Sequence, residues 1–180
     1  MSKVLIITTS IRAKSNSDIL AEKVAEGARE AGHDVEVISL KEKKIGFCKG
    51  CLACLKTKKC LIADDAVEMA EKIKESDTLV FATPIYYYEM SGQMKTLLDR
   101  MNPLYSSDYK FQKVYMISVA AEDEEFVPER AENGLKGWVD CFDKAEFAGS
   151  LFCGGINDMG EAAGRDKELD EAYRFGMSLE

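Results

Sequence analysis

Short apolar runs alternate with amphipathic stretches along the whole chain, and this alternation predicts strands that are each followed by a helix. The apolar runs are rich in β-branched residues and stay apolar through their middles, as strands buried on both faces of a sheet do. We predict five strands, at residues 4–7, 35–40, 78–82, 114–119 and 147–152.

The amphipathic stretches repeat apolar residues at intervals of three and four, which predicts helices between the strands. The first helix ends near Ala31, and the second is capped by Asp64 or Asp65. The other expected features are helices at 91–101, around 135–142 and at 168–179, a third strand that ends at Thr83-Pro84, and an exposed segment at 105–110. Such alternation predicts an α/β fold, a parallel sheet with helices on both faces.

Size and composition narrow the class of protein. A chain of 180 residues, 46% hydrophobic and 31% charged, fits one domain over residues 1–180. No apolar run is long enough for a membrane span, and no signal-peptide core precedes the first strand, so we expect a cytoplasmic protein. The net charge of −8 argues against nucleic acid as a partner.

The loop between the first strand and the first helix is the first candidate site. Almost every side chain in residues 8–17 can donate a hydrogen bond, and the loop enters a helix N-terminus with free N–H groups. These features favour a phosphate site. The alternative is a capped turn, with Ser15, Asn16 or Ser17 as the N-cap.

Parallel sheets bind ligands beyond the carboxyl ends of their strands. The loops 9–17, 84–92 and 120–126 would meet there, with 154–160 close by. The second loop has the sequence PIYYYEMSG, whose aromatic rings and backbone amides suit a flat heteroaromatic ring. A phosphate site beside an aromatic ring site indicates a mononucleotide, and flavin mononucleotide (FMN) fits best.

Four cysteines lie in a loop at about residues 46–62. Cys48, Cys51, Cys54 and Cys60 form C-x2-C-x2-C-x5-C, a spacing that suits a four-thiolate [4Fe-4S] cluster or, less well, zinc. The alternative is a metal-free loop kept for packing or redox chemistry. Because the loop leaves the second strand at the carboxyl edge, we expect the four thiols to converge there, beside the flavin site.

Other candidate residues are few. Seven lysines between Lys41 and Lys59 could attract the 2′-phosphate of NADPH or an acidic protein, or form a solvated face. The single histidine, His33, lies in a turn at the amino edge and is expected to be exposed and structural. Cys141 and Cys153 are expected to be buried thiols.

Three motifs together carry a family resemblance. TSIRAKSNS resembles the phosphate loop of the NAD(P)H-dependent FMN reductases, and TPIYYYEMSGQMKTLLDR is similar to their second signature. CKGCLACLKTKKCLIADD resembles the cysteine block of one branch, which includes the iron–sulfur flavoproteins. The resemblance implies a flavodoxin-like three-layer sandwich with five parallel strands in the order 2-1-3-4-5, and a homodimer or homotetramer.

The resemblance also implies roles for particular residues. Its phosphate loop corresponds to Ser10, Arg12, Ser15, Asn16 and Ser17, and its ring loops to Pro84, Ile85, Tyr86, Tyr87, Ser91, Gly92 and Ala120. The chain departs from the family pattern at Ile11, where proline is usual, at Ser15, where glycine is usual, and at Ala120-Ala121, where a glycine pair is usual.

The function we expect is an FMN-dependent oxidoreductase that takes hydride from NAD(P)H. Electrons would then pass to a quinone, another flavin or a redox protein, with chemistry supplied by the cofactor rather than by a catalytic side chain. One alternative is an iron–sulfur flavoprotein that carries electrons between proteins. Another is a metal-binding interaction module without flavin.

Overall fold

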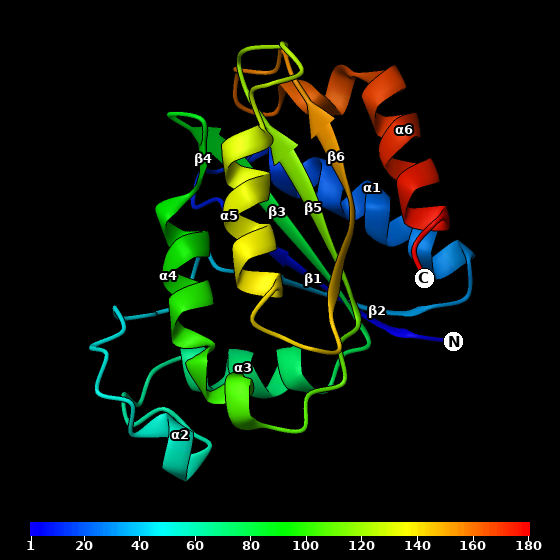
Figure 1. The fold of residues 1–180 in the computed structure, drawn as a ribbon. Helices are drawn as coiled ribbons and strands as arrows, with labels where there is room; N and C mark the ends of the chain where they lie inside the picture. The colour runs from blue at the N-terminus through cyan, green and yellow to red at the C-terminus, as the bar shows by residue number, and fades with distance from the viewer.

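The computed structural model describes residues 1–180 and contains one mixed sheet (Figure 1). The strands are β1 (Lys3–Thr8), β2 (Asp34–Ser39), β3 (Thr78–Tyr86), β4 (Glu89–Met90), β5 (Lys113–Val119) and β6 (Glu146–Cys153). The helices are α1 (Asn16–Glu30), α2 (Cys54–Thr57), α3 (Ala66–Lys74), α4 (Gly92–Arg100), α5 (Glu129–Val139) and α6 (Asp166–Met177), with short 3-10 turns at Asn102–Ser106 and Glu161–Gly164.

The sheet has the strand order β2-β1-β3-β5-β6, and all of these neighbours are parallel. Counted without β4, this is the predicted order 2-1-3-4-5, so the flavodoxin-like prediction is confirmed. The sixth strand, β4, was not predicted. It pairs antiparallel with the end of β3 and forms a short hairpin at the carboxyl edge of the sheet.

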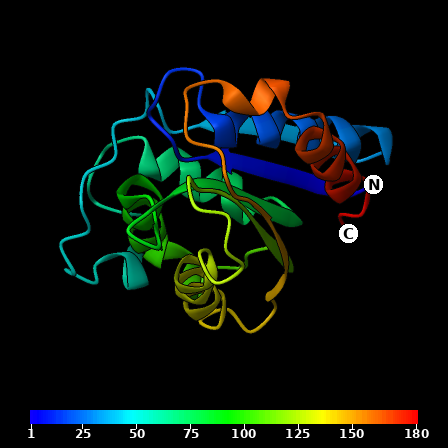
Figure 2. The same ribbon diagram turned by 90° about the horizontal axis from the view of Figure 1, so that it is seen from above.

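Helices cover both faces of the sheet (Figure 2). On one face, Val4 and Ile6 pack in a core with α1 and α6. On the other face, Leu5 and Ile7 pack in a core with α3, α4 and α5. This alternation follows from the period of two in a strand, and it explains why β1 is apolar throughout. No helix is both long and apolar enough to cross a membrane.

Four local predictions are wrong. Strand β3 does not end at Thr83-Pro84, because Pro84 still pairs with Val119 in the register of β5 and the strand continues into the hairpin. The segment 105–110 is not exposed throughout, since the ring of Tyr109 packs 4.5 Å from that of Phe111. Cys141 is exposed because α5 ends at Val139 and the turn faces outward. His33 is half-buried, with its ring 3.1 Å from the Leu179 carbonyl oxygen.

Cys153, by contrast, is buried at the end of β6 as predicted. Burial raises the pKa of its thiol to about 12. At neutral pH the thiol is therefore protonated and inert.

Candidate functional site

The carboxyl ends of β1, β3 and β5 border a pocket of about 170 Å³. Nine of the twelve predicted cofactor-binding residues line it, namely Ser10, Arg12, Ser15, Asn16, Ser17, Pro84, Ile85, Tyr86 and Ala120. Tyr87, Ser91 and Gly92 do not line it. Four lining residues were not predicted: Val119, Ala121, Ile156 and Asn157.

The first turn of α1 forms the polar end of this pocket. Ser15 caps the helix, with its Oγ accepting from Asp18 N at 3.4 Å, and its hydroxyl lies 2.9 Å from that of Ser17. The N–H groups of the first turn have no partner within the helix, and the helix dipole is positive here. Lys14 takes a left-handed backbone, φ +47°, just before the cap. The capped turn and the predicted phosphate site are therefore the same segment, so the two alternatives do not exclude each other.

The turn after β6 closes the pocket against the first loop. Arg12 Nη1 donates to the Asn157 carbonyl at 2.9 Å, and Asn16 Nδ2 donates to the Asp158 carbonyl at 2.8 Å. Asn16 Oδ1 also accepts from Ala162 N at 3.0 Å. Asn16 thus joins two loops, a role that the sequence motif does not reveal.

Glu161 holds the same turn in shape. Its carboxylate accepts from the backbone N–H groups of Asn157 and Asp158, both at 2.9 Å, and pairs with Arg165. Hydrogen bonds from Arg165 and from these two amides lower the pKa of Glu161 to about 2. The carboxylate is therefore charged throughout the physiological range.

Ser91 lies behind the pocket rather than in it. Its Oγ is 2.9 Å from Thr9 Oγ1 and caps α4 by accepting from Met94 N at 3.2 Å. Its own N–H donates to Thr83 Oγ1 at 2.9 Å. The three buried hydroxyl side chains fasten the start of α4 to the ends of β1 and β3. Thr9 directly follows β1, but Thr83 lies inside β3, where the sequence gives no signal for a polar contact.

The three consecutive tyrosines separate in space. Tyr86 is 53% exposed and borders the pocket, while Tyr87 is 97% exposed and points away from it. Tyr87 and Tyr88 form the two-residue turn of the β3–β4 hairpin, both with positive φ. Such a backbone costs roughly 1–2 kcal/mol per non-glycine residue.

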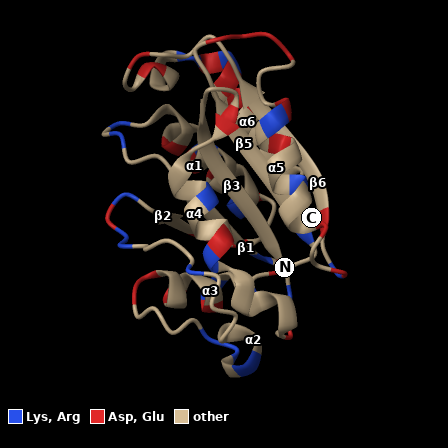
Figure 3. Ribbon diagram, turned by 60° about the vertical axis from the view of Figure 1, so that its left-hand side comes forward, with Lys and Arg blue, Asp and Glu red and all other residues tan.

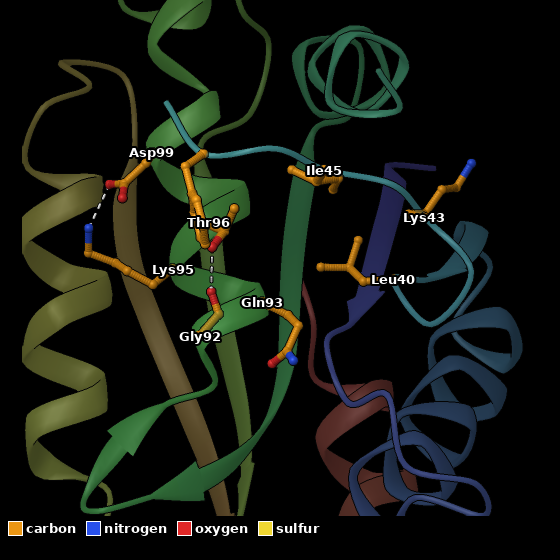
Figure 4. A pocket seen from close by; sticks show the side chains of 9 residues that line it. Leu40, Lys43, Ile45, Gly92, Gln93, Lys95, Thr96 and Asp99 are labelled. Atoms are coloured by element: carbon orange, nitrogen blue, oxygen red, sulfur yellow. Dashed lines mark hydrogen bonds and ion pairs between the residues drawn. The ribbon is translucent and has the colours of Figure 1, made fainter. Parts of the chain in front are cut away.

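A larger groove of about 600 Å³ lies between α4 and residues 40–47 (Figure 4). Leu40, Ile45 and Phe47 give it an apolar side. Its two lysines already have partners, Lys95 with Asp99 at 2.6 Å and Lys43 with Glu68 at 3.3 Å. The groove has no converging free donors, so the smaller pocket is the better site for a phosphorylated ligand.

The four cysteines of the motif line a separate pocket of about 290 Å³ with Asp99 and Asn102. Cys54 Sγ accepts from Asn102 Nδ2 at 3.0 Å, and Cys60 Sγ accepts from Arg100 Nη2 at 3.4 Å. Both contacts lie at the C-terminal end of α4, whereas Ser91, the N-cap of α4, contacts Thr9 at the end of β1. Figure 1 accordingly shows α2 near the end of α4 and the β4 hairpin near its start. No three of these thiols are placed around one point, and the two pockets share no lining residue, so the expectation that the four thiols converge beside the predicted flavin site is wrong.

Arg100 explains where the cysteine loop goes. Its side chain is fully buried, and its guanidinium donates to both carboxylate oxygens of Asp64, at 2.6 and 2.8 Å. It also donates to the carbonyls of Gly46 and Ile62, at 2.7 and 3.2 Å. Both ends of the loop are thus held at the last turn of α4.

Lysines gather on the segment around α2 (Figure 3).

The two implied cofactors fit the chain differently. The carboxyl-edge pocket offers hydroxyls, an arginine and a helix N-terminus at one end and apolar or aromatic side chains at the other, a donor set that fits FMN. The cysteine pocket offers four thiols, but no three metal-binding side chains are placed to hold an ion. As folded here, the loop does not fit an iron–sulfur cluster.

Relatives with curated descriptions match part of the chain. An iron–sulfur flavoprotein of Methanocaldococcus jannaschii is 37% identical over 102 residues, which are 57% of this chain and 53% of that protein. An NAD(P)H dehydrogenase (quinone) of Methanosarcina barkeri is 33% identical over 119 residues, which are 63% of this chain and 56% of that protein. The chain spans about half the length of the curated relatives it matches most strongly.

The fold is that of a solved NAD(P)H:quinone oxidoreductase from Methanothermobacter marburgensis. The TM-score is 0.79 with 22% identity, over 99% of this chain and 96% of that one. The family model for NADPH-dependent FMN reductase matches residues 2–141, which contain three of the four segments that build the pocket. The chain belongs to the NADPH-dependent FMN reductase family.

Proposed function

We propose that this chain binds FMN in the carboxyl-edge pocket and is an NAD(P)H-dependent oxidoreductase. The observation that carries the proposal is the convergence of polar phosphate-loop residues and apolar residues from β3 and β5 on one pocket. Family membership supports it independently. FMN would supply the hydride and electron chemistry, so the chain needs no catalytic nucleophile or base.

In this proposal, different residues contact the phosphate and the ring of FMN. The hydroxyls of Ser10, Ser15 and Ser17, the Arg12 guanidinium and the free N–H groups of α1 would hold the phosphate. Pro84, Ile85 and Tyr86 would contact one side of the ring, and Ala120 the other. Because the chain offers one such anion site, we expect FMN to bind better than flavin adenine dinucleotide.

Steady-state kinetics test the activity. We expect the FMN-loaded protein to oxidise NADH or NADPH, with electrons passed to a quinone, a free flavin or a redox protein. The assay compares both nicotinamides with a water-soluble benzoquinone as acceptor. No oxidation of either nicotinamide above the rate of free FMN would contradict the proposal.

An electron carrier with a [4Fe-4S] cluster is the second candidate. It is favoured because Cys48, Cys51, Cys54 and Cys60 line one pocket, and because several relatives are described as iron–sulfur flavoproteins. The loop would have to rearrange to bring the thiols together. Anaerobic reconstitution with iron and sulfide tests this. Failure to incorporate iron would leave the metal-free reductase as the better account.

We also propose a homodimer or homotetramer. Tyr86 and Tyr87 of the β3–β4 hairpin and Phe126 of the loop after β5 are large side chains that stay more than half exposed. Such exposed patches are typical of interaction surfaces. Light scattering after gel filtration measures the mass directly, and a monomer at micromolar concentration would contradict this assembly.

A further inference from the structure

The turn between β3 and β4 has a backbone that its residues do not favour. Tyr87 and Tyr88 have φ values of +51° and +66°, in a two-residue turn that is usually made by Asn-Gly or Gly-Gly. At such positive φ values a bulky side chain lies too close to its own backbone. A contact outside the turn must therefore hold it in place.

Tyr88 makes that contact, whereas Tyr87 is too exposed to do so. The Tyr88 hydroxyl donates to the Glu122 carboxylate, with distances of 3.0 and 3.3 Å to its two oxygens. The Tyr88 ring stacks on Phe126, with centroids 6.0 Å apart, and the Arg130 guanidinium lies 5.8 Å from its centroid. All three partners follow β5 in the chain, so Tyr88 ties the hairpin to the next loop.

These contacts join two walls of the carboxyl-edge pocket. Ile85 and Tyr86 precede the turn on one side, and Ala120 and Ala121 directly precede Glu122 on the other. Figure 1 shows the β4 hairpin beside the start of α5, which follows the same loop.

The loop after β5 also contacts the turn after β6. Gly155 N donates to the Glu122 carbonyl at 3.3 Å, and a Cβ atom on Gly154 would lie 2.5 Å from Asp123 Cα. The turn after β6 therefore packs against the far side of residues 122–123. Residues 122–123 are thus held between the turn after β6 and Tyr88 of the hairpin.

We propose that Tyr88 is a positioning residue, whose hydrogen bond to Glu122 sets the width of the pocket where the flavin ring binds. This inference rests on the proposed function, because the ligand must be a flavin. The partners of Tyr88 lie in the segment that follows Ala120 and Ala121, on the ring side of the pocket, and none belongs to the phosphate loop. Its effect should thus be the same for a flavin with a phosphate and for one without.

Fluorescence titrations with FMN and riboflavin separate these contributions. We expect Tyr88→Phe, which keeps the stacked ring and removes the hydroxyl, to weaken both ligands by the same factor, about threefold to tenfold. Arg12→Ala should weaken FMN by a larger factor than riboflavin, because the phosphate contact is lost for FMN alone, whereas the bond to Asn157 is lost for both ligands. Tyr105→Phe removes a hydroxyl from an exposed tyrosine outside the pocket and serves as the matched control, with no effect on either ligand.

Glu122→Gln is the second variant, and it lies on the surface, so it should fold. We expect an effect between those of the parent and Tyr88→Phe, because an uncharged acceptor remains. The double variant should bind no worse than Tyr88→Phe alone, since both changes break one contact.

The outcomes are distinguishable. If the parent binds FMN, and the Tyr88→Phe variant binds each flavin as tightly as the parent does, the inference is overturned and the proposed function stands. Additive losses in the double variant would overturn it too. A parent that binds neither flavin would overturn the proposed function and this inference with it.

Discussion

At the scale of single residues, the motif indicated which side chains meet but not what each one does. Ser15 was expected in the phosphate loop, and it is also the N-cap of α1. Asn16 and Ser91 were expected to contact the cofactor, yet both bond to neighbouring loops. Local spacing predicts proximity, while the choice of partner depends on segments more than 70 residues away, which local spacing does not reveal.

Arg12→Ala should weaken FMN binding by about tenfold or more, because a charge-assisted hydrogen bond to phosphate contributes on the order of 1.5–3 kcal/mol. Flavin fluorescence quenching measures the dissociation constant, and circular dichroism checks that the fold is unchanged. Equal FMN affinity in parent and variant would mean that Arg12 serves only to bond Asn157.

Ser91→Ala should lower the free energy of unfolding by about 1–2 kcal/mol, because it removes the α4 cap and the contact with Thr9. Ser91→Gly is the matched variant, since glycine is nearly as good an N-cap but also loses the Thr9 contact. Urea unfolding of both separates the two contributions. Identical stability of the parent and the alanine variant would show that neither contact matters.

At the scale of elements, the strands and helices were largely predictable because each is a continuous pattern. The five parallel strands follow from apolar runs, and the helices from apolar repeats. The β4 hairpin was missed because its turn residues are tyrosines rather than glycine or asparagine. The position of the cysteine loop was missed because it depends on Arg100 and Asp64, which are 36 residues apart.

The Arg100–Asp64 pair predicts a pH dependence. Burial raises the pKa of Asp64, but hydrogen bonds from Arg100, Gly46 and Ala66 lower it by more, so the folded pKa lies below the ordinary value of 3.8. A lowered folded pKa contributes stability above the unfolded pKa, which is lost as the pH falls through the folded pKa. Asp64→Asn should therefore cost about 3 kcal/mol or more at pH 6, and less as the pH falls below about 4.

Urea unfolding of parent and variant between pH 6 and pH 3 measures this difference. Asp99→Asn is the control, because Asp99 forms an exposed pair with Lys95, and such pairs contribute about 1 kcal/mol or less. A parent–variant difference that stays constant over this pH range would show that the Asp64 charge does not stabilise the fold.

At the scale of the whole molecule, α4 separates two candidate sites. Its N-cap, Ser91, lies behind the carboxyl-edge pocket, and its last residue, Arg100, holds the cysteine loop. The general site at the carboxyl edge was predictable, since parallel sheets bind ligands there. The place of the thiols outside this pocket was not predictable, because a long loop can leave one edge of the sheet and pack elsewhere.

The central claim is that one FMN binds in the pocket between the phosphate loop and the β3–β4 hairpin. Titration of the purified chain with FMN, followed by flavin fluorescence, tests it most directly. We expect quenching that saturates at about one FMN per chain at micromolar protein, and weaker binding of riboflavin, which lacks the phosphate. No quenching at micromolar protein, or equal affinity for both ligands, would contradict the claim.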